Sequence, residues 1–191
     1  MNDQSISRKL HLDRVAVERL GYDDLSAVRY IDSTSLRLVG QRYTRDDRVD
    51  SLLDHIQSPA YTDRLAEAVR SQTLIGARFE GELVGTAAWA NRAVRARIDS
   101  ILVRPMMTGL GVGTLLLEAI EASARNAGYK ELAVSGPLES TDFFEQRGFN
   151  THSQGILMLG GILQIPVCFM RKPLRGNSSF LTKADGETNL H

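Results

Sequence analysis

The 191-residue sequence contains one cysteine, Cys168, so no disulfide can form within the chain. It has no excess of charge, because 23 Lys and Arg residues balance 23 Asp and Glu residues. A neutral chain has no general attraction for nucleic acid or for an anionic membrane surface, and we expect neither as a partner. The lone cysteine fits a reducing compartment, so the expected location is cytoplasmic.

Long hydrophobic runs are also absent. Residues 1–14 are polar and contain no apolar core of a signal peptide. The most apolar stretch, residues 155–170, is shorter than a membrane span and is interrupted by Gly160, Gly161 and Pro166. This stretch therefore predicts two buried strands with a connection between them.

Ligand sets for a metal are missing as well. The four histidines, His11, His55, His152 and His191, are scattered without the spacing of metal ligands, so no metal site is expected. Cys168 lies in an apolar segment with no partnered base in view. Core packing is therefore expected for Cys168 rather than a role as nucleophile.

What is present is the composition of a globular domain, with 42% hydrophobic and 24% charged residues. Apolar spacing and capping residues predict helices after Asp23 or Asp24, after Thr44, after Thr62, and over 111–127 and 138–147. Strands are predicted over 14–20, 73–79, 83–90, 96–103, 131–135, 149–159 and 165–172, with a turn at 91–94. This order predicts one layered α/β (α+β) domain with a mixed sheet over 13–174, between a flexible lead, 1–12, and a flexible tail, 175–191.

Glycines alternate with other residues at Gly109, Gly111 and Gly113, between a predicted strand and a predicted helix. Glycine lets the backbone approach a ligand closely, and the first amides of a helix form a site for a phosphate group. A Walker loop is excluded because Gly-Lys-Ser/Thr is missing. A dinucleotide fingerprint is excluded because its third glycine would fall on Thr114 or Leu116. A coenzyme A loop and a tightly packed turn both remain open from the glycines alone.

The segment around these glycines resembles the acetyl-CoA motif of the GNAT superfamily of acetyltransferases. That motif is a strand ending in Val-x-Pro, followed by Arg/Gln-x-x-Gly-x-Gly/Ala. Here Val103-Arg104-Pro105 is followed by Thr108, Gly111 and Gly113 at the signature positions. Thr108 departs from the motif, in which Arg or Gln is usual.

A second segment supports the resemblance. Residues 143–149, FFEQRGF, resemble the Phe-Tyr-Glu-x-x-Gly-Phe ending of the family, with Phe144 at the place of a tyrosine. The resemblance spans roughly residues 13–174. It implies a mostly antiparallel sheet, flanked by helices, that splays around acetyl-CoA. The residues that it places at the cofactor are Ile101, Leu102, Val103, Thr108, Gly109, Leu110, Gly111, Val112, Gly113, Thr114 and Phe144.

The reaction that the resemblance implies is direct transfer of an acetyl group from the thioester to an amine. A protonated amine cannot attack, so a base must take its proton. Asp99 is the candidate, since it lies mid-strand, on the same side as Ile101 and Val103 if the alternation is regular. The other interpretation is that Asp99 is a strand-edge carboxylate paired with Arg97 or Arg95. Glu80 and Glu82 are weaker candidates because a hairpin turn explains them.

Two functions of different classes remain open. The first is an N-acetyltransferase that acts on an amine of a small molecule or a protein. The second is a non-catalytic acyl-CoA-binding sensor or regulatory module, which Phe144 and Thr108 favour. A nucleotide-binding module is a weaker third. The resemblance also implies that the acceptor contacts residues 25–65 and 80–95, and that a homodimer can form.

Overall fold

The computed structural model describes residues 12–43, 46–92, 94–159 and 161–174. The predicted tail and nearly all of the predicted lead lie outside these residues, as does the expected cap at Thr44. Among the described residues, no helix is long and apolar enough to cross a membrane.

One seven-stranded sheet has the order β1-β2-β3-β4-β5-β7-β6. Only β4 and β5 are parallel, and every other neighbouring pair is antiparallel. The predicted mixed, mostly antiparallel sheet is therefore confirmed. The strands are β1 (Val15–Arg19), β2 (Leu74–Phe79), β3 (Glu82–Arg92), β4 (Arg95–Val103), β5 (Glu131–Pro137), β6 (Asn150–Leu159) and β7 (Leu163–Pro173).

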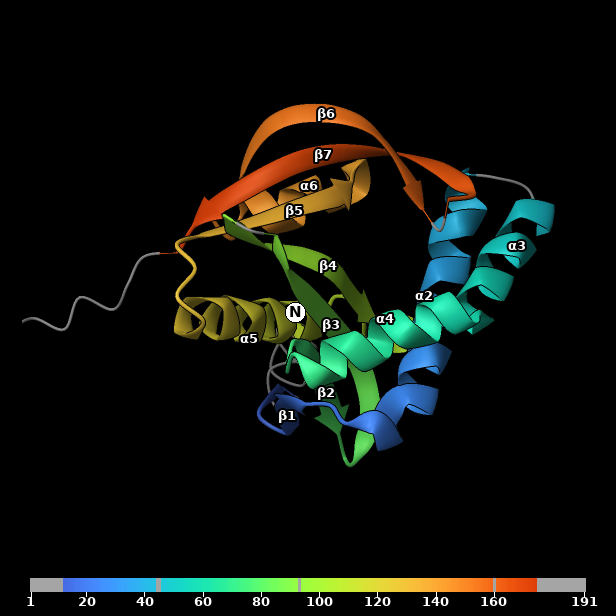
Figure 1. Cartoon of the computed structure of the whole chain (residues 1–191), viewed down its shortest axis with the longest axis horizontal. Coiled ribbons are helices and arrows are strands. Elements are labelled where there is room, and N and C mark those ends of the chain that lie inside the picture. Colours follow the sequence, from blue (N-terminus) through green and yellow to red (C-terminus); the bar gives the residue numbers. More distant parts are fainter. Residues whose placement is uncertain (1–11, 44–45, 93, 160, 175–191) are drawn as a thin grey trace, which may run out of the picture.

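Helices cover both faces of the sheet (Figure 1). The long ones are α2 (Leu25–Tyr43), α3 (Asp46–Gln57), α4 (Pro59–Arg70) and α5 (Val112–Asn126). The short ones are η1 (Tyr22–Asp24), η2 (Pro105–Met107), η3 (Leu138–Ser140) and α6 (Thr141–Glu145). One core cluster buries Leu116 and Ile120 of α5 against the sheet, and a second buries Ile31 of α2 and Leu65 of α4 against β2 and β3.

Three local expectations were wrong in detail. The helix expected after Thr62 starts at Pro59, and its N-cap is Ser58, whose hydroxyl accepts a hydrogen bond from the Tyr61 amide. Proline at the first helical position suits this start because its missing N–H is not needed there. The predicted turn at 91–94 is shorter, since Asn91 and Arg92 still pair with β4. The predicted helix 138–147 is a 3-10 turn followed by the five-residue α6.

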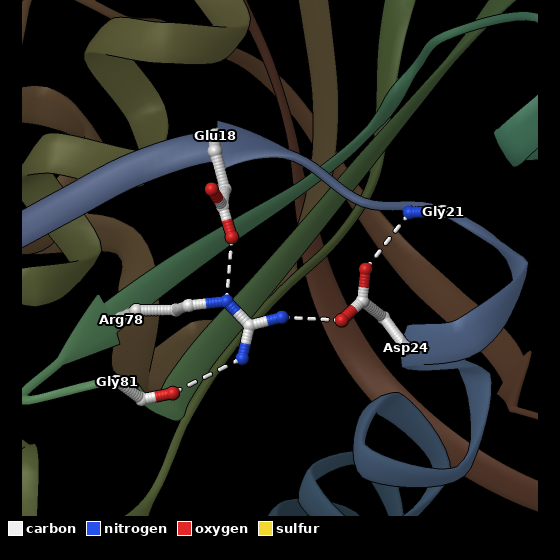
Figure 2. A network of polar contacts seen from close by, with 5 residues as sticks. All are labelled: Glu18, Gly21, Asp24, Arg78 and Gly81. Atoms are coloured by element: carbon white, nitrogen blue, oxygen red, sulfur yellow. Dashed lines mark hydrogen bonds and ion pairs between the residues drawn. The ribbon is translucent and has the colours of Figure 1, made fainter.

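The start of α2 is fixed by a polar network around Arg78 (Figure 2). The Arg78 guanidinium pairs with Glu18 of β1 and with Asp24 of η1, and it donates to the Gly81 carbonyl over 3.2 Å. Asp24 in turn accepts a hydrogen bond of 2.9 Å from the Gly21 amide. This network joins β1, η1 and the β2–β3 turn, so it holds the base of the helix that reaches the functional site at its other end.

The sheet opens between its two parallel strands. β4 and β5 pair only at Ala96–Leu132, Arg97–Ala133 and Ile98–Val134. Beyond these pairs β4 runs on to Val103 and β5 to Pro137 without further pairing between them. The predicted splay is therefore confirmed, and Figure 1 shows the two strands diverging.

Candidate active site

Two cavities meet at the split between β4 and β5. One, of about 470 Å³, runs from the glycine loop to Ile101 and Phe144. The other, of about 360 Å³, lies over the split itself and is bounded by α2, α4, β6 and β7. Both are lined by Ile101 and Leu102 of β4, and by Val39 and Arg42 of α2. A ligand in the first cavity can therefore meet a ligand in the second at the divergent strands.

The glycine loop presents free backbone donors at the start of α5. Among the described residues, no acceptor takes a hydrogen bond from the amides of Gly109, Gly111, Val112 or Gly113. The Thr114 amide, in contrast, already donates to the Gly111 carbonyl over 3.0 Å. Four unsatisfied amides at the positive end of a fifteen-residue helix form a site suited to phosphate oxygens.

Two glycines in the loop need positive φ, at +77° for Gly109 and +91° for Gly111. Other residues adopt these angles at a cost in energy. A Cβ on Gly111 would also lie 2.8 Å from Leu12, which covers this residue. Gly113 differs, because a Cβ there would meet the Phe143 ring at an ordinary 3.5 Å. Gly113 is thus the loop glycine that can carry a side chain with neither a close contact nor a positive φ.

Arg147 lines the same cavity and was not predicted from the sequence. Its guanidinium donates to Thr114 Oγ1 over 2.6 Å and to the Phe143 carbonyl over 2.7 Å, and it lies 4.0 Å from the centre of the Phe143 ring. These contacts place a fixed positive charge beside the loop. The one available signal was an arginine just before the glycine of the FFEQRGF segment.

The structure brings most of the predicted cofactor residues to the first cavity. Nine of them line it, namely Ile101, Leu102, Val103, Thr108, Gly109, Gly111, Gly113, Thr114 and Phe144. Leu110 and Val112 do not, and the Val112 side chain is buried in the core, so only backbone groups of these two face the loop site. The Thr108 hydroxyl makes a long contact of 3.5 Å to the Arg104 carbonyl.

Phe144 stands where the two cavities join and lines both. Its side chain is buried between Phe143 and Phe149, with ring centroids 5.0 and 5.3 Å away. Gly136 in β5 permits this position, since a Cβ there would lie 3.2 Å from the Phe144 ring and 2.5 Å from Ser140. Phe144 therefore gives the junction an apolar wall and offers no proton.

Asp99 lies at an irregularity in β4 that the sequence did not reveal. Ala88 of β3 pairs with Ser100 and Trp89 pairs with Ile98, so Asp99 is left as the unpaired residue of a bulge. The regular alternation assumed for Asp99 and Ile101 is interrupted there. The bulge leaves Asp99 at the wall of the second cavity.

The Asp99 carboxylate is largely buried, with 19% of its side chain exposed. Its Oδ1 lies 3.4 Å from Arg97 Nε and 4.0 Å from Arg92 Nη2. The same oxygen accepts no hydrogen bond from any described residue. Of the two pairings expected from the sequence, Arg97 is found, while Arg95 pairs with Glu131. Asp99 thus combines nearby positive charge with a buried acceptor atom that receives no hydrogen bond from the described residues.

Two tyrosine–carboxylate pairs lie at the second cavity. The Tyr43 hydroxyl donates to Glu139, and burial together with this carboxylate raises the pKa of Tyr43 to about 12. The same hydrogen bond lowers the pKa of Glu139. The Tyr61 hydroxyl donates to the buried Asp32, whose other oxygen accepts from Thr86 over 3.1 Å. Burial raises the pKa of both Asp32 and Tyr61.

The acceptor region expected from the sequence coincides only in part with the lining of the second cavity. Residues of α2 and α4 line the second cavity, as expected from 25–65. Among the described residues of 80–95, none lines either cavity. Glu80 and Glu82 instead pair with Arg14 and Arg104, away from the split. The far wall comes from β6 and β7, which no sequence signal pointed to.

The remaining reactive groups take no part in this site. Cys168 is buried in the core and accepts a contact from Thr141 Oγ1 over 3.3 Å, as core packing predicts. No cluster of His, Cys, Asp and Glu that could hold a metal ion occurs among the described residues. The expectation that no metal is bound remains a prediction.

Comparisons with known proteins agree with this geometry. A sequence model of the acetyltransferase (GNAT) family matches residues 41–149. No curated protein sequence matches the chain significantly.

Solved structures of similar fold include three acetyltransferases. The PaiA N-acetyltransferase of Thermoplasma acidophilum, in complex with coenzyme A, has a TM-score of 0.69 and 18% identity, over 83% of this chain and 98% of that one. A GCN5-related N-acetyltransferase from Rhodopseudomonas palustris has 0.66 and 24%, over 83% and 95%. A ribosomal-protein-alanine N-acetyltransferase from Brucella melitensis has 0.63 and 19%, over 83% and 99%. At these identities the likeness shows the fold.

Proposed function

Because the chain belongs to the acetyltransferase (GNAT) family, we propose that it transfers an acetyl group from acetyl-CoA to a primary amine by direct attack. The observation that carries the proposal is the pair of cavities that meet where β4 and β5 separate. One cavity begins at free backbone amides suited to phosphate, and the other contains a carboxylate suited to a proton. Two substrates can thus approach one another where the strands separate.

Acetyl-CoA is the cofactor, and the residues of this chain fit it. The unsatisfied amides of Gly109, Gly111, Val112 and Gly113 can hold its pyrophosphate, with Arg147 adding positive charge beside them. The edge of β4 that faces the split at Ile101–Val103 can bind the pantetheine arm. Bound there, acetyl-CoA supplies its acetyl group as a thioester that an amine can attack.

Asp99 is the base in this proposal. The amine must lose a proton to become a nucleophile, and Asp99 is a carboxylate residue in the lining of the cavity that the amine would occupy. Phe144 cannot donate a proton to the departing sulfur. A thiol has a pKa of about 8.5, so its thiolate leaves acceptably without an acidic side chain, and solvent supplies that proton.

A second candidate function is an acyl-CoA sensor without turnover. Phe144 at the junction and Thr108 in the loop favour it. Phe144 lacks the hydroxyl of the tyrosine that is usual in the family, and Thr108 stands where Arg or Gln is usual. The first function requires an amine as acceptor, whereas the second requires no acceptor. We also propose a cytoplasmic location, which the single cysteine of the sequence supports. A homodimer remains a prediction that light scattering would test.

The test combines binding with turnover. Coenzyme A at about 100 times its Kd should stabilise the fold by about 2.7 kcal/mol and raise the melting temperature. Adenosine diphosphate at the same concentration is the control, because it lacks the pantetheine arm. Release of free CoA from acetyl-CoA is then measured across a panel of amines. An unchanged melting temperature contradicts the cofactor site, while binding without amine-dependent CoA release identifies the sensor.

A further inference from the structure

We infer that the acceptor amine also carries a carboxylate and a hydrocarbon portion, an inference that rests on the proposed transfer reaction. Its basis is the charge arrangement of the 360 Å³ cavity. The charged side chains that line it are two arginines and two carboxylates, Arg42, Arg64, Asp99 and Glu139. The sequence alone does not show which charges face a substrate, because the first helices carry side chains of both signs.

The two carboxylates of the cavity are already engaged. Asp99 lies between Arg97 at 3.4 Å and Arg92 at 4.0 Å. Glu139 accepts the hydrogen bond of the Tyr43 hydroxyl, and its charge interacts with Arg42. Each carboxylate of the cavity therefore already has a positively charged neighbour, and none of these neighbours is Arg64.

Of the two arginines, Arg42 interacts with the charge of Glu139, and Arg64 is left without a carboxylate from the cavity lining. Within the described part of the chain, no carboxylate oxygen lies within 4.0 Å of the guanidinium of Arg42 or Arg64. Arg64 lies 4.5 Å from the centre of the Tyr61 ring, which holds it against the cavity wall. The negative group that acts on it from behind Tyr61 is Asp32, which is 3% exposed and occupied by hydrogen bonds from Tyr61 and Thr86.

An arginine at a cavity wall with no carboxylate within ion-pair distance suits a carboxylate ligand. The planar guanidinium can bind both oxygens of a carboxylate through two parallel hydrogen bonds. Arg42 lines both cavities, whereas Arg64 lines only the one over the split. The carboxylate of the acceptor is therefore assigned to Arg64, with Arg42 as a second positive charge.

The other walls of the cavity are aliphatic, which suits a hydrocarbon portion next to the two charged ends. They come from α2, β6 and β7, and the residues are Leu36, Val39, Leu157, Leu159, Ile165 and Val167. A cavity of about 360 Å³ is at the small end of the range for small-molecule sites. The substrate class is thus a small amino acid with an apolar side chain, or an ω-amino acid with a methylene chain, rather than a folded protein.

Matched acceptor pairs test the assignment. Release of CoA is measured with leucine and 3-methylbutylamine, with phenylalanine and phenethylamine, and with ω-amino acids and the corresponding alkylamines. Carboxylated acceptors should show the lower KM. Arg64→Ala should raise that KM about tenfold or more, as expected for loss of a hydrogen-bonded ion pair, and leave the KM of the amines without a carboxylate unchanged. Arg64→Lys should retain part of the preference.

The matched control is Arg70→Ala on the same helix, because Arg70 bonds to Glu67 and does not line the cavity. It should leave both classes of acceptor unaffected. The inference is overturned if amines without a carboxylate are used as well as carboxylated ones. It is also overturned if the effect of Arg64→Ala is equal for both classes. If no amine releases CoA, the proposed transfer fails instead. Calorimetric titration of leucine and 3-methylbutylamine into the CoA-saturated protein then decides whether Arg64 binds a carboxylate.

Discussion

The two sides of the split between β4 and β5 are built in different ways. The side proposed for the cofactor is a contiguous segment, residues 105–114, whose useful groups are backbone amides and glycine conformations. The acceptor side draws on α2, α4, β4, η3, β6 and β7, and its useful groups are side chains that carry charge or ionise. Affinity for CoA should therefore vary little with pH, whereas turnover and acceptor binding should depend on pH strongly.

Substitution of the proposed base should have the largest effect and act on the acceptor side alone. Asp99→Asn should lower turnover by about 100- to 10,000-fold, the usual contribution of general acid–base catalysis, with the affinity for acetyl-CoA unchanged. The loss should shrink at high pH, where more of the amine arrives deprotonated. Steady-state rates over a pH series measure both effects.

The control for this variant is Asp54→Asn, an exposed carboxylate on α3 that lines neither cavity. It should change neither turnover nor its pH profile. An Asp99→Asn enzyme with the parent's rate and pH profile would leave a water chain to remove the proton. The contrast between a pH-dependent and a pH-independent side would then no longer rest on Asp99.

Substitution in the glycine loop should act on the cofactor side alone. Gly113→Asp adds a carboxylate at the start of α5 without the positive-φ strain that a side chain at Gly109 or Gly111 would carry. Hydrogen bonds to charged groups contribute about 1.5–3 kcal/mol, so CoA affinity should fall about tenfold or more. Calorimetric titration with CoA measures the loss.

Gly113→Ala is the matched control, since its methyl group meets the Phe143 ring at an ordinary distance and adds no charge. It should bind CoA nearly as the parent does. Equal affinity in Gly113→Asp and the parent would mean that the glycines only form a tight turn. The KM for the acceptor should stay the same in both variants, because Gly113 does not line the second cavity.

The smallest expected effect is on stability, through Asp32 behind the acceptor cavity. Burial raises the pKa of Asp32 above its ordinary 3.8, so the folded state binds a proton more tightly than the unfolded state does. Its contribution to the free energy of unfolding is therefore complete below about pH 3.8 and declines as pH rises through the folded-state pKa. Asp32→Asn should remove this decline.

Urea unfolding of the parent and of Asp32→Asn at a series of pH values isolates the effect. The difference in unfolding free energy, parent minus variant, should fall as pH rises above 3.8 and then level off. Subtraction removes the contributions of all other titrating groups. A difference that is constant or rises with pH would show that the hydrogen bonds from Tyr61 and Thr86 outweigh burial.

Much of the fold could be predicted because its signals are local. Apolar runs of strand length on either side of a turn indicate β2 and β3, and α5 begins within one residue of its predicted start because Gly111 caps it in a left-handed conformation. The errors fall where a neighbouring residue competes with the predicted signal. Ser58 followed by Pro59 starts α4 in place of Thr62, and pairing with β4 extends β3 into the expected turn.

The sequence by itself determined the order of the elements, the position of the glycine loop and the family resemblance. All three rest on residues that are close together in the chain and on backbone requirements that only certain residue types meet. The tertiary structure alone decided the bulge at Asp99, the approach of Arg64 to the cavity, and the wall from β6 and β7. These features depend on strand register and helix packing between segments up to about 130 residues apart, from Leu36 to Val167, and such contacts leave no periodic trace in the sequence.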